Sequence, residues 1–361
     1  MNIMVFDVPA ETSGALSVLR DFYQEASTSK DTNINWIFVV GRPQLEEKEN
    51  VKVVSFPWIK KSWLHRLFFD YFIAPKLVKQ YRANRVFSLQ NVIVPCTKVS
   101  QILYLHQPLP FIDHKFSFFD NKKFWLYQNV LSKSNIKSIQ KAEKVIVQTE
   151  WMKKACVEKS GVGPEKMHVV PPLVKTEVKH FFKPTTPAFK TFFYPATEMV
   201  YKNHSLIVEA CKELKAKRIT DFKVIFTLLG NENDHVVNLY REVKEHDLPI
   251  EFAGNLPRDH VFELYTKSIL LFPSYIETFG LPLLEAMLHK GIVLASDCPF
   301  SREILGGYEN AYFFDAFKVK ELSNIMERAL EGKIQYKAPL HFDTVDHSSN
   351  QTLKIVIGSK E

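Results

Sequence analysis

Short hydrophobic runs alternate with longer stretches of helical periodicity along the first half of the chain. The runs have the length of strands and are rich in Val, Ile and Phe; they lie at residues 2–8, 34–40, 51–56, 85–89, 101–106 and 144–149. After the first run, a loop with Ser13 and Gly14 leads into an amphipathic pattern that predicts a helix from about Ala15 to Ala26. Strands that alternate with helices indicate a parallel sheet covered by helices on both faces.

A second series of the same kind follows a proline-rich break. Prolines disfavour helices and interior strands, so we interpret residues 173–190, which follow Pro171 and Pro172, as an interdomain linker. Hydrophobic runs return at residues 191–196, 224–230, 249–254, 269–274, 291–296 and 311–315. The predicted fold is therefore α/β, with Rossmann-like domains at 1–172 and 191–335 and a ligand expected in a cleft between them, at the carboxyl ends of the strands. Residues 336–361 are a tail without clear periodicity before 351–358, and packing back on the N-terminal domain is one placement for it.

Length and composition agree with two packed domains. The chain has 361 residues, which is longer than the chains that usually fold around a single hydrophobic core. Its hydrophobic content of 46% is that of a globular protein. Its four cysteines are far apart and form no CxxC pair, so we expect reduced thiols and neither a zinc site nor a disulfide framework. The sequence begins without a signal-peptide pattern and has no run of 18 apolar residues, and we expect a cytoplasmic protein.

The net charge of +7 is distributed unevenly. Residues 1–180 contain 26 basic and 16 acidic side chains, whereas the remainder contains 21 and 24. Within the first half, residues 51–144 contain 16 basic and 4 acidic side chains. Such a density attracts phosphates, anionic lipid or nucleic acid.

The most informative segment is residues 272–291, FPSYIETFGLPLLEAMLHKG. A buried strand ends near Pro273, a loop carries Glu277, and Gly280 precedes a helix that begins near Pro282. The free N–H groups at a helix N-terminus suit a diphosphate, and a glycine there lets a ligand approach the main chain. Glu277 and Glu285 are eight positions apart, so both carboxylates can face one cleft and accept hydrogen bonds from sugar or ribose hydroxyls.

This segment, together with GIVLASDCPFSREILGG downstream and AGNLPRDHVFELYTKSILLFPS upstream, resembles the family-four retaining glycosyltransferases, whose hallmark is the E-x7-E motif. The resemblance covers about residues 192–316 and is looser over the first half. It implies the GT-B fold, with Glu277 contacting the transferred sugar and Glu285 the ribose. It also implies a sugar-diphosphate pocket lined by Thr278, Phe279, Gly280 and Leu281.

A lysine upstream fits the same chemistry. Lys202 lies at the start of a predicted helix near Asn203, where a cation could neutralise a diphosphate leaving group. The family has a phosphate-contacting lysine at this position and commonly an arginine a few residues earlier, where this chain has Tyr194, Pro195 and Ala196. The missing arginine leaves Lys202 with more of the phosphate role, and Arg302 is a further candidate. The family needs no bound metal, the chain has no DxD motif, and we expect neither a metal nor a cofactor besides the donor.

In the first half, the resemblance implies two more site residues. Gly14 resembles the family's glycine loop near the donor phosphates, although only one glycine is present. His106 resembles the histidine that approaches the donor sugar, and it lies at the carboxyl end of a predicted strand. A structural role is the alternative for His106, and no residue stands out as a nucleophile.

Residues 57–85 combine aromatic and basic side chains. Helical spacing places six apolar residues on one stripe: Trp63, Leu64, Leu67, Phe68, Tyr71 and Phe72. Seven cations surround it: Lys60, Lys61, Arg66, Lys76, Lys79, Arg82 and Arg85. Two interpretations remain open: a helix that packs its apolar stripe on the sheet and turns a polar face to solvent, or a surface that docks on an anionic membrane.

We expect a transferase that moves a hexose from a UDP or GDP sugar to a glycan or lipid-linked acceptor in surface-polysaccharide synthesis, at the inner face of the cytoplasmic membrane. Retention at the anomeric carbon is implied by the family. The alternatives are a nucleotide-sugar-binding protein without catalysis, an epimerase or phosphorylase with the same fold, and a nucleic-acid-binding protein. The last ranks low because the chain has no recognised nucleic-acid-reading motif, and we expect no nucleic-acid partner.

Overall fold

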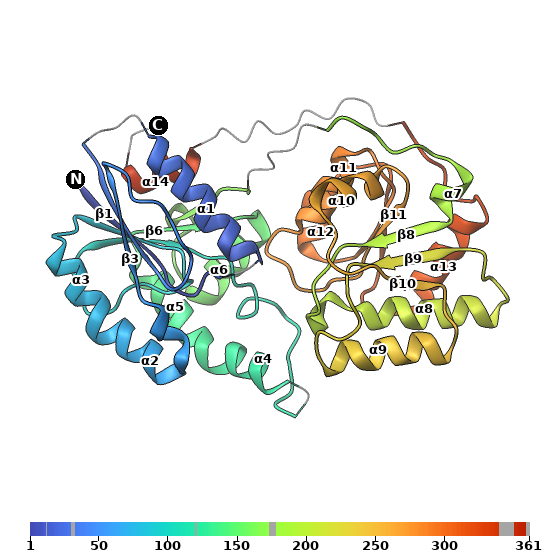
Figure 1. Cartoon of the computed structure of the whole chain (residues 1–361), viewed down its shortest axis with the longest axis horizontal. Helices are drawn as coiled ribbons and strands as arrows, with labels where there is room; N and C mark the ends of the chain where they lie inside the picture. Colours follow the sequence, from blue (N-terminus) through green and yellow to red (C-terminus); the bar gives the residue numbers. More distant parts are fainter. Residues whose placement is uncertain (12, 30–32, 120, 173–177, 339–349, 359–361) are drawn as a thin grey trace. The chain divides into compact units, whose positions relative to one another are not determined.

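The chain folds into two compact units, which are described separately. The computed structural model describes residues 1–11, 13–29, 33–119, 121–172, 178–338 and 350–358. The first unit comprises Met1–Leu173 and Val345–Glu361, and the second comprises Val174–Thr344. Both units appear in Figure 1 as a sheet with helices on both faces.

The first unit is built on a parallel seven-stranded sheet with the strand order β3-β2-β1-β4-β5-β6-β7. The strands are β1 (Asn2–Asp7), β2 (Asn35–Val40), β3 (Val51–Ser55), β4 (Arg85–Ser88), β5 (Ser100–Tyr104), β6 (Lys144–Val147) and β7 (Met167–Val169). All neighbours pair in parallel, as for Phe6 opposite both Val39 and Ser88. The order turns outward in both directions from β1, which places the carboxyl ends of β1 and β4 at a topological switch point.

Helices cover both faces of this sheet. They are α1 (Ser13–Thr28), α2 (Trp63–Phe68), α3 (Ala74–Gln80), α4 (Lys122–Leu126), α5 (Ser132–Lys141), α6 (Glu150–Ser160) and α14 (Gln351–Ile357). Shorter helical turns are η1 (Pro57–Lys61), the π-helical η2 (Phe69–Ile73) and η3 (Tyr127–Leu131), and η4 (Pro164–Lys166). One apolar layer, with Phe22 and Trp36, lies under α1 and α14, and a second, with Phe69 and Leu77, lies under η2 and α3.

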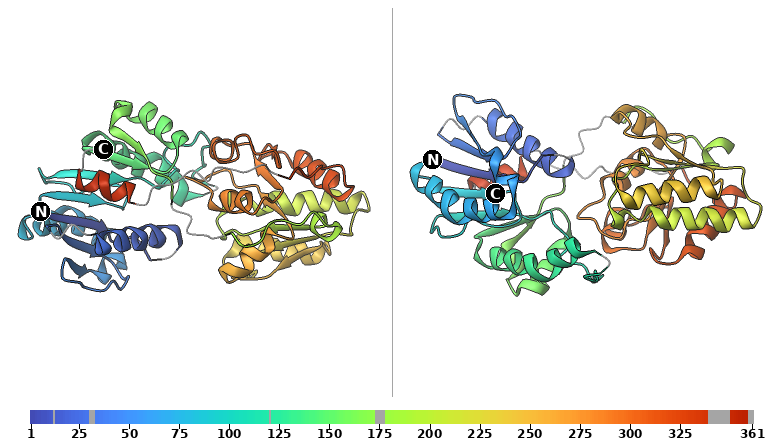
Figure 2. Two further views of the ribbon diagram at one scale, coloured as in Figure 1. Left: turned by 90° about the horizontal axis from the view of Figure 1, so that it is seen from above. Right: turned by 60° about the horizontal axis from the view of Figure 1, so that its bottom comes forward.

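The helix α14 belongs to the first unit although it ends the described chain. Leu353 and Val356 are buried in the same apolar layer as Phe22, and Arg85 Nη1 donates a hydrogen bond to the Val356 carbonyl oxygen at 2.8 Å. Figure 2 shows α14, in red, among the blue and green elements of this unit. The sequence pattern did not define this helix, and residues 339–349 of the predicted tail lie outside the described residues.

The second unit contains a parallel six-stranded sheet with the order β10-β9-β8-β11-β12-β13. Its strands are β8 (Thr191–Tyr194), β9 (Lys223–Phe226), β10 (Ile250–Phe252), β11 (Ile269–Phe272), β12 (Val293–Ser296) and β13 (Ala311–Phe314). Its helices are α7 (Thr186–Phe189), η5 (Val200–Lys202), α8 (His204–Ala216), α9 (Asp234–Glu245), α10 (Arg258–Tyr265), α11 (Leu281–Leu288), α12 (Pro299–Ile304) and α13 (Val319–Leu330). The strand order again reverses at a switch point, here between β8 and β11.

The predicted α/β class with two Rossmann-like units is confirmed, and every predicted strand is present. Three details differ. The three-residue strand β7 was not predicted, and α1 begins at Ser13, so Gly14 lies in its first turn rather than in a loop. Part of the predicted linker, residues 173–177, lies outside the described residues, but α7 forms within the remainder because Pro187 occupies its first turn, where no N–H is needed. Within the described part of the chain, every helix is too short or too polar to span a bilayer.

Candidate functional site

Two loops meet at the carboxyl edge of the second sheet, one after β8 and one after β11. The loop after β8 ends at Asn203, whose φ of 62° lies in the left-handed region and which precedes α8. The side-chain amide of Asn203 donates to the Ala316 carbonyl oxygen at 2.7 Å, and the Tyr194 hydroxyl donates to the Lys202 carbonyl oxygen at 2.6 Å. These bonds fix the backbone that carries Lys202.

An ion pair joins the two loops. Lys202 Nζ lies 2.5 Å from Glu277 Oε1, and the Ser274 hydroxyl donates to the same oxygen at 2.8 Å. The side chains of Lys202 and Glu277 are only 17% and 14% exposed, so water screens the pair weakly. A third bond supports Ser274, since Ser296 Oγ donates to its carbonyl oxygen at 2.5 Å. The sequence predicted Lys202 and Glu277 for one site, and the structure brings them together.

The helix α11 begins at Leu281, four positions after Glu277. Its N-cap is Gly280, with φ of 96°, and no side chain caps the helix. A β-carbon at Gly280 would lie 3.2 Å from Leu283 Cδ1, so both backbone and space favour glycine. The first turn of α11 contains no acidic residue, and Pro282 lies in it. This uncapped N-terminus offers main-chain N–H groups and a partial positive charge to an anion.

The residues between Glu277 and α11 differ in exposure. Thr278 is partly buried, Phe279 and Gly280 are buried, and Leu281 is exposed. The side chain of Phe279 is therefore packed inside the unit, whereas the side chain of Leu281 is exposed to solvent.

Glu285, on α11, belongs to a separate hydrogen-bond cluster. Its Oε1 accepts from Arg258 Nη2 at 2.9 Å and its Oε2 from the Tyr265 hydroxyl at 3.0 Å, both donors coming from α10. Burial raises the pKa of the Glu285 carboxyl, while the Arg258 charge opposes the shift. Each oxygen has a protein donor and retains capacity for one more bond, because a carboxylate oxygen has two lone pairs.

Arg302 is engaged with an acidic neighbour. Its Nε and Nη2 donate to the two carboxylate oxygens of Asp297 at 2.6 and 2.8 Å, and its guanidinium lies 3.8 Å from the centre of the Phe313 ring. This bidentate pair neutralises the positive charge that the sequence suggested for phosphate binding. Lys202 also has an acidic partner, but its pair with Glu277 is much less exposed than the pair of Arg302 with Asp297.

The first residue of α8, His204, supports the lysine loop from beneath. Its ring is 1% exposed and packs against Tyr194 and Phe226, with ring centres 4.8 and 5.0 Å apart. Burial, reinforced by the positive charges of His235 and Lys202, lowers the pKa of His204 to about 3. His204 is therefore a neutral packing residue at physiological pH.

The remaining predicted site residues, Gly14 and His106, belong to the first unit. His106 follows β5, and its backbone N–H donates to Asn91 Oδ1 at 2.8 Å, while its Nε2 lies 3.2 Å from Asn91 Nδ2. Burial lowers the pKa of His106 to about 4, so its ring is neutral at pH 7. Gly14 leaves open space where a side chain would lie, with no atom within 4 Å of an added β-carbon.

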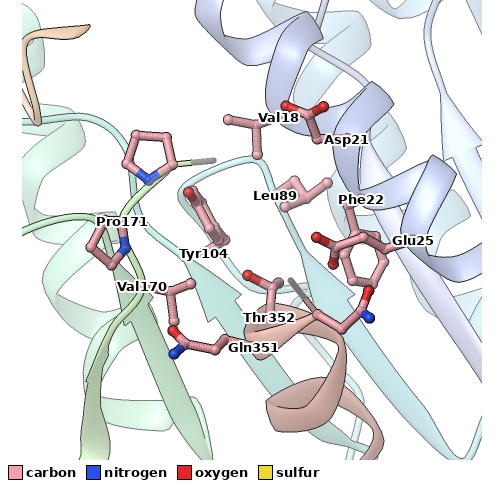
Figure 3. Close-up of a pocket in the computed structure, with 12 residues that line it drawn as sticks. Val18, Asp21, Phe22, Glu25, Leu89, Tyr104, Val170, Pro171, Gln351 and Thr352 are labelled. Carbon is pink, nitrogen blue, oxygen red and sulfur yellow. The ribbon is translucent and has the colours of Figure 1, made fainter. Parts of the chain in front are cut away.

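A small cavity in the first unit does not match the predicted donor site. Figure 3 shows Asp21 and Glu25 from α1, Tyr104 at the end of β5, and Gln351 and Thr352 from α14 around it. Its volume is about 60 Å³, whereas ligand pockets usually have several hundred. Two carboxylates in its wall would also repel a diphosphate.

Comparison with known proteins identifies the second unit. Residues 177–341 match the family model described as glycosyl transferases group 1. The chain therefore carries a group 1 glycosyl transferase domain. A stretch of 147 residues is 36% identical to the serotype-specific mannosyltransferase WbdA of Escherichia coli, covering 40% of this chain but only 17% of WbdA. The chain thus spans a small part of the curated relatives that it matches.

Solved structures show the fold of both units. The structure of Anabaena HepE in complex with UDP and glucose aligns with a TM-score of 0.63 and 15% identity, over 99% of this chain and 95% of that one. The lipopolysaccharide outer core galactosyltransferase WaaB aligns with a TM-score of 0.62 and 16% identity, over 93% and 92%. The group 1 domain is thus part of a GT-B fold, as expected.

Several residues of the site were not predicted. Ser274 precedes Glu277 by three positions and was visible in the motif, but its hydroxyl bond to that carboxylate depends on the turn of the loop. Arg258 and Tyr265 contact Glu285 from 27 and 20 positions away, and only the packing of α10 on α11 brings them there. Sequence spacing contains no signal for that contact.

Acidification should destabilise the second unit through His204. Because the pKa of His204 is about 3 in the folded chain and 6.5 normally, protons favour the unfolded state as pH falls from 6.5 towards 3. The resulting loss is about 1.4 kcal/mol per pH unit over that window. Urea unfolding of the full chain should show this slope at least in part, and His204→Phe should reduce it. His235→Phe, at a partly buried histidine, is the comparison variant. If His204→Phe leaves the pH slope of the unfolding free energy unchanged, His204 is not the group that causes it.

Proposed function

We propose that this chain is a retaining glycosyltransferase that moves a hexose from a nucleotide diphosphate sugar to a hydroxyl of a glycan or lipid-linked acceptor in polysaccharide synthesis. The observation that supports it best is the Lys202–Glu277 ion pair. Glu277 precedes Gly280, the N-cap of the uncapped helix α11, by three positions. The group 1 domain, the relative WbdA and the structural neighbours with bound UDP agree with it.

In the reaction, the bond between the anomeric carbon and the diphosphate oxygen breaks and the acceptor oxygen bonds to that carbon. The nucleoside diphosphate leaves with the electron pair, and the acceptor proton passes to a phosphate oxygen on the same face, which gives retention. The step creates negative charge on the leaving phosphate. A preorganised cation and main-chain N–H groups stabilise that charge most where water is scarce.

Lys202 and the α11 N-terminus are the groups suited to this task. Without a donor, the Lys202 ammonium is neutralised by Glu277. A diphosphate would compete for the ammonium and free Glu277 to accept hydrogen bonds from sugar hydroxyls, with Ser274 keeping its carboxylate oriented. The positive charge that faces the diphosphate is supplied by Lys202 and the N-terminus of α11. The proposal therefore includes transfer without a divalent metal.

Glu285 is proposed to accept a bond from the donor ribose through the lone pairs that Arg258 and Tyr265 leave unused. In the first unit, His106 is proposed to reach the donor sugar as a neutral hydrogen-bonding group and Gly14 to lie near the donor phosphates. No nucleophilic side chain is required by this mechanism. The donor is proposed to be a UDP or GDP sugar.

A nucleotide-sugar panel tests the function. Among UDP, GDP and ADP sugars, one class should raise the melting temperature of the chain, because a ligand that binds only the folded state stabilises it. Release of the matching nucleoside diphosphate in the presence of a glycan acceptor should persist in excess EDTA. A flat panel would contradict the enzyme proposal, while an epimerised sugar with no diphosphate released would favour the epimerase instead. Loss of transfer in EDTA would reject only the metal-independent part.

Removing the ammonium should slow transfer far more than it weakens donor binding. We expect Lys202→Ala to lower kcat by about a hundredfold or more, because the leaving phosphate loses its cation. Glu277→Gln should lower kcat/KM through lost sugar contacts. The matched controls are Lys267→Ala and Glu263→Gln, an exposed lysine–glutamate pair 2.6 Å apart, with Glu263 on α10 and Lys267 two positions after its end. Rates within a few-fold of wild type for both site variants would exclude the pair from catalysis.

A binding comparison separates a ribose contact from a structural role for Glu285. Glu285→Gln should raise the donor Kd by about tenfold, which is the loss of one good hydrogen bond. Tyr265→Phe removes one of the two donors that hold Glu285 but leaves its charge and the Arg258 bond, so its donor Kd should stay close to wild type. Isothermal titration with the stabilising nucleotide sugar provides both values. Equal weakening by the two variants would show that Glu285 only orders α10 against α11.

A further inference from the structure

An apolar ridge with a basic border lies on α2 and η2 of the first unit. Five large apolar side chains there are between 51% and 75% exposed: Trp63, Leu64, Phe68, Tyr71 and Phe72. Phe68 and Phe72 stack on each other, with ring centres 5.4 Å apart. Soluble proteins rarely leave neighbouring aromatic side chains so open to water unless the surface binds something.

The exposed ridge is not the side of this segment that packs on the sheet. The same segment buries Ile59, Phe69, Ala74 and Leu77 against Met4, Phe6, Ile37 and Val39 of the sheet. The helical turns are thus anchored through one apolar side and present a second one to solvent. Of the two interpretations that the sequence left open, the one in which the stripe packs on the sheet therefore fails for these five side chains. A 3.6-residue period identifies the residues that share a face, but it does not show which of two apolar faces meets the sheet.

The charge around the ridge has one sign. Lys61, Lys76, Lys79 and Arg82 are exposed and, among the described residues, form no ion pair. The only acidic residue between positions 57 and 85 is Asp70, which pairs with Arg66 at 2.7 Å and is largely buried. The exposed charge therefore suits an anionic partner.

A second ridge of the same kind lies on the segment with α4 and η3. Phe118, Phe119, Leu126 and Val130 are 37% to 91% exposed, next to the exposed Lys122 and Lys123. Lys122 Nζ lies 5.6 Å from the Phe118 ring centre. Figure 1 shows α2 and α4 at the same lower edge of this unit, and both remain in front when that edge is turned forward in Figure 2.

We propose that these two ridges dock the first unit on an anionic lipid bilayer. Aromatic and leucine side chains would enter the interface between headgroups and acyl chains, and the lysines would contact lipid phosphates. A folded acidic protein is the less suitable partner, because exposed aromatic side chains and lysines on two separate helical segments match a deformable, uniformly anionic surface better than a fixed pocket. The inference goes beyond glycosyl transfer and does not depend on it.

Vesicle sedimentation of the full chain tests the proposal. The chain should bind phosphatidylglycerol vesicles at low salt, bind phosphatidylcholine vesicles much more weakly, and lose affinity severalfold when salt rises to about 0.5 M. The double variant Phe68→Ser, Phe72→Ser should lower the partition coefficient by about tenfold or more. Phe119→Ser should lower it as well, and Lys61→Glu with Lys79→Glu should remove the preference for anionic lipid.

Two controls keep the result specific. Phe181→Ser changes a 46% exposed phenylalanine of the second unit and should leave vesicle binding unchanged. Because all substituted side chains are exposed, each variant should keep the melting temperature and the stabilisation by donor sugar of the wild type. Wild-type chain that stays in the supernatant at low salt, or a ridge variant that binds vesicles like wild type, would overturn the proposal. A lipid-free dimer that the phenylalanine variant converts to monomer would instead assign the ridge to self-association.

Discussion

The contact between the Lys202 ammonium and the Glu277 carboxylate is the interaction around which the second unit is arranged. It connects the loops after two adjacent central strands, β8 and β11, at the point where the strand order reverses. An ammonium and a carboxylate at this depth each require a partner, because an unpaired buried charge is costly. A ligand that separates them must therefore bring a negative group for the lysine and hydrogen-bond donors for the glutamate. A sugar diphosphate has both.

The supporting residues explain how that pair keeps its geometry. Tyr194, Asn203 and Ser274 form hydrogen bonds with loop backbone or with the Glu277 carboxylate, and neutral His204 fills the space beneath without adding charge. Under the proposed function, a second charged group next to Lys202 would alter the competition between Glu277 and a donor phosphate for the lysine ammonium. Keeping the histidine neutral leaves that competition to two groups only.

Most of the fold could be predicted because buried parallel strands appear as continuous hydrophobic runs. The exceptions have physical reasons. The three-residue strand β7 ends two positions before Pro171, where the proline-rich break obscures a strand pattern. The seven-residue helix α14 is buried through contacts far away in sequence, with Arg85 and the layer around Phe22. Helical periodicity grouped the residues of the α2 ridge, but it left open whether that stripe faces the sheet or the solvent.

The candidate site divides in the same way. Glu277, Gly280 and Lys202 could be selected because a loop, a glycine and a helix start form a local pattern, and the family resemblance gave them roles. The partners Arg258 and Tyr265 could not, since helix-to-helix packing brings them to Glu285. Arg258 and Tyr265 occupy one lone pair on each Glu285 oxygen and leave the others open to a ligand. The sequence alone could not predict which hydrogen bonds of Glu285 remain available.

The placement of α14 affects the order in which the molecule can mature during synthesis. Domains generally fold from the N-terminus as the ribosome releases them. Here the layer beneath α1 lacks Leu353 and Val356 until α14 has been synthesised, which happens after the second unit. Until then the first unit has an uncovered apolar strip where α14, a seven-residue helix of about two turns, packs. Loss of α14 would therefore destabilise a unit whose other residues were translated earlier.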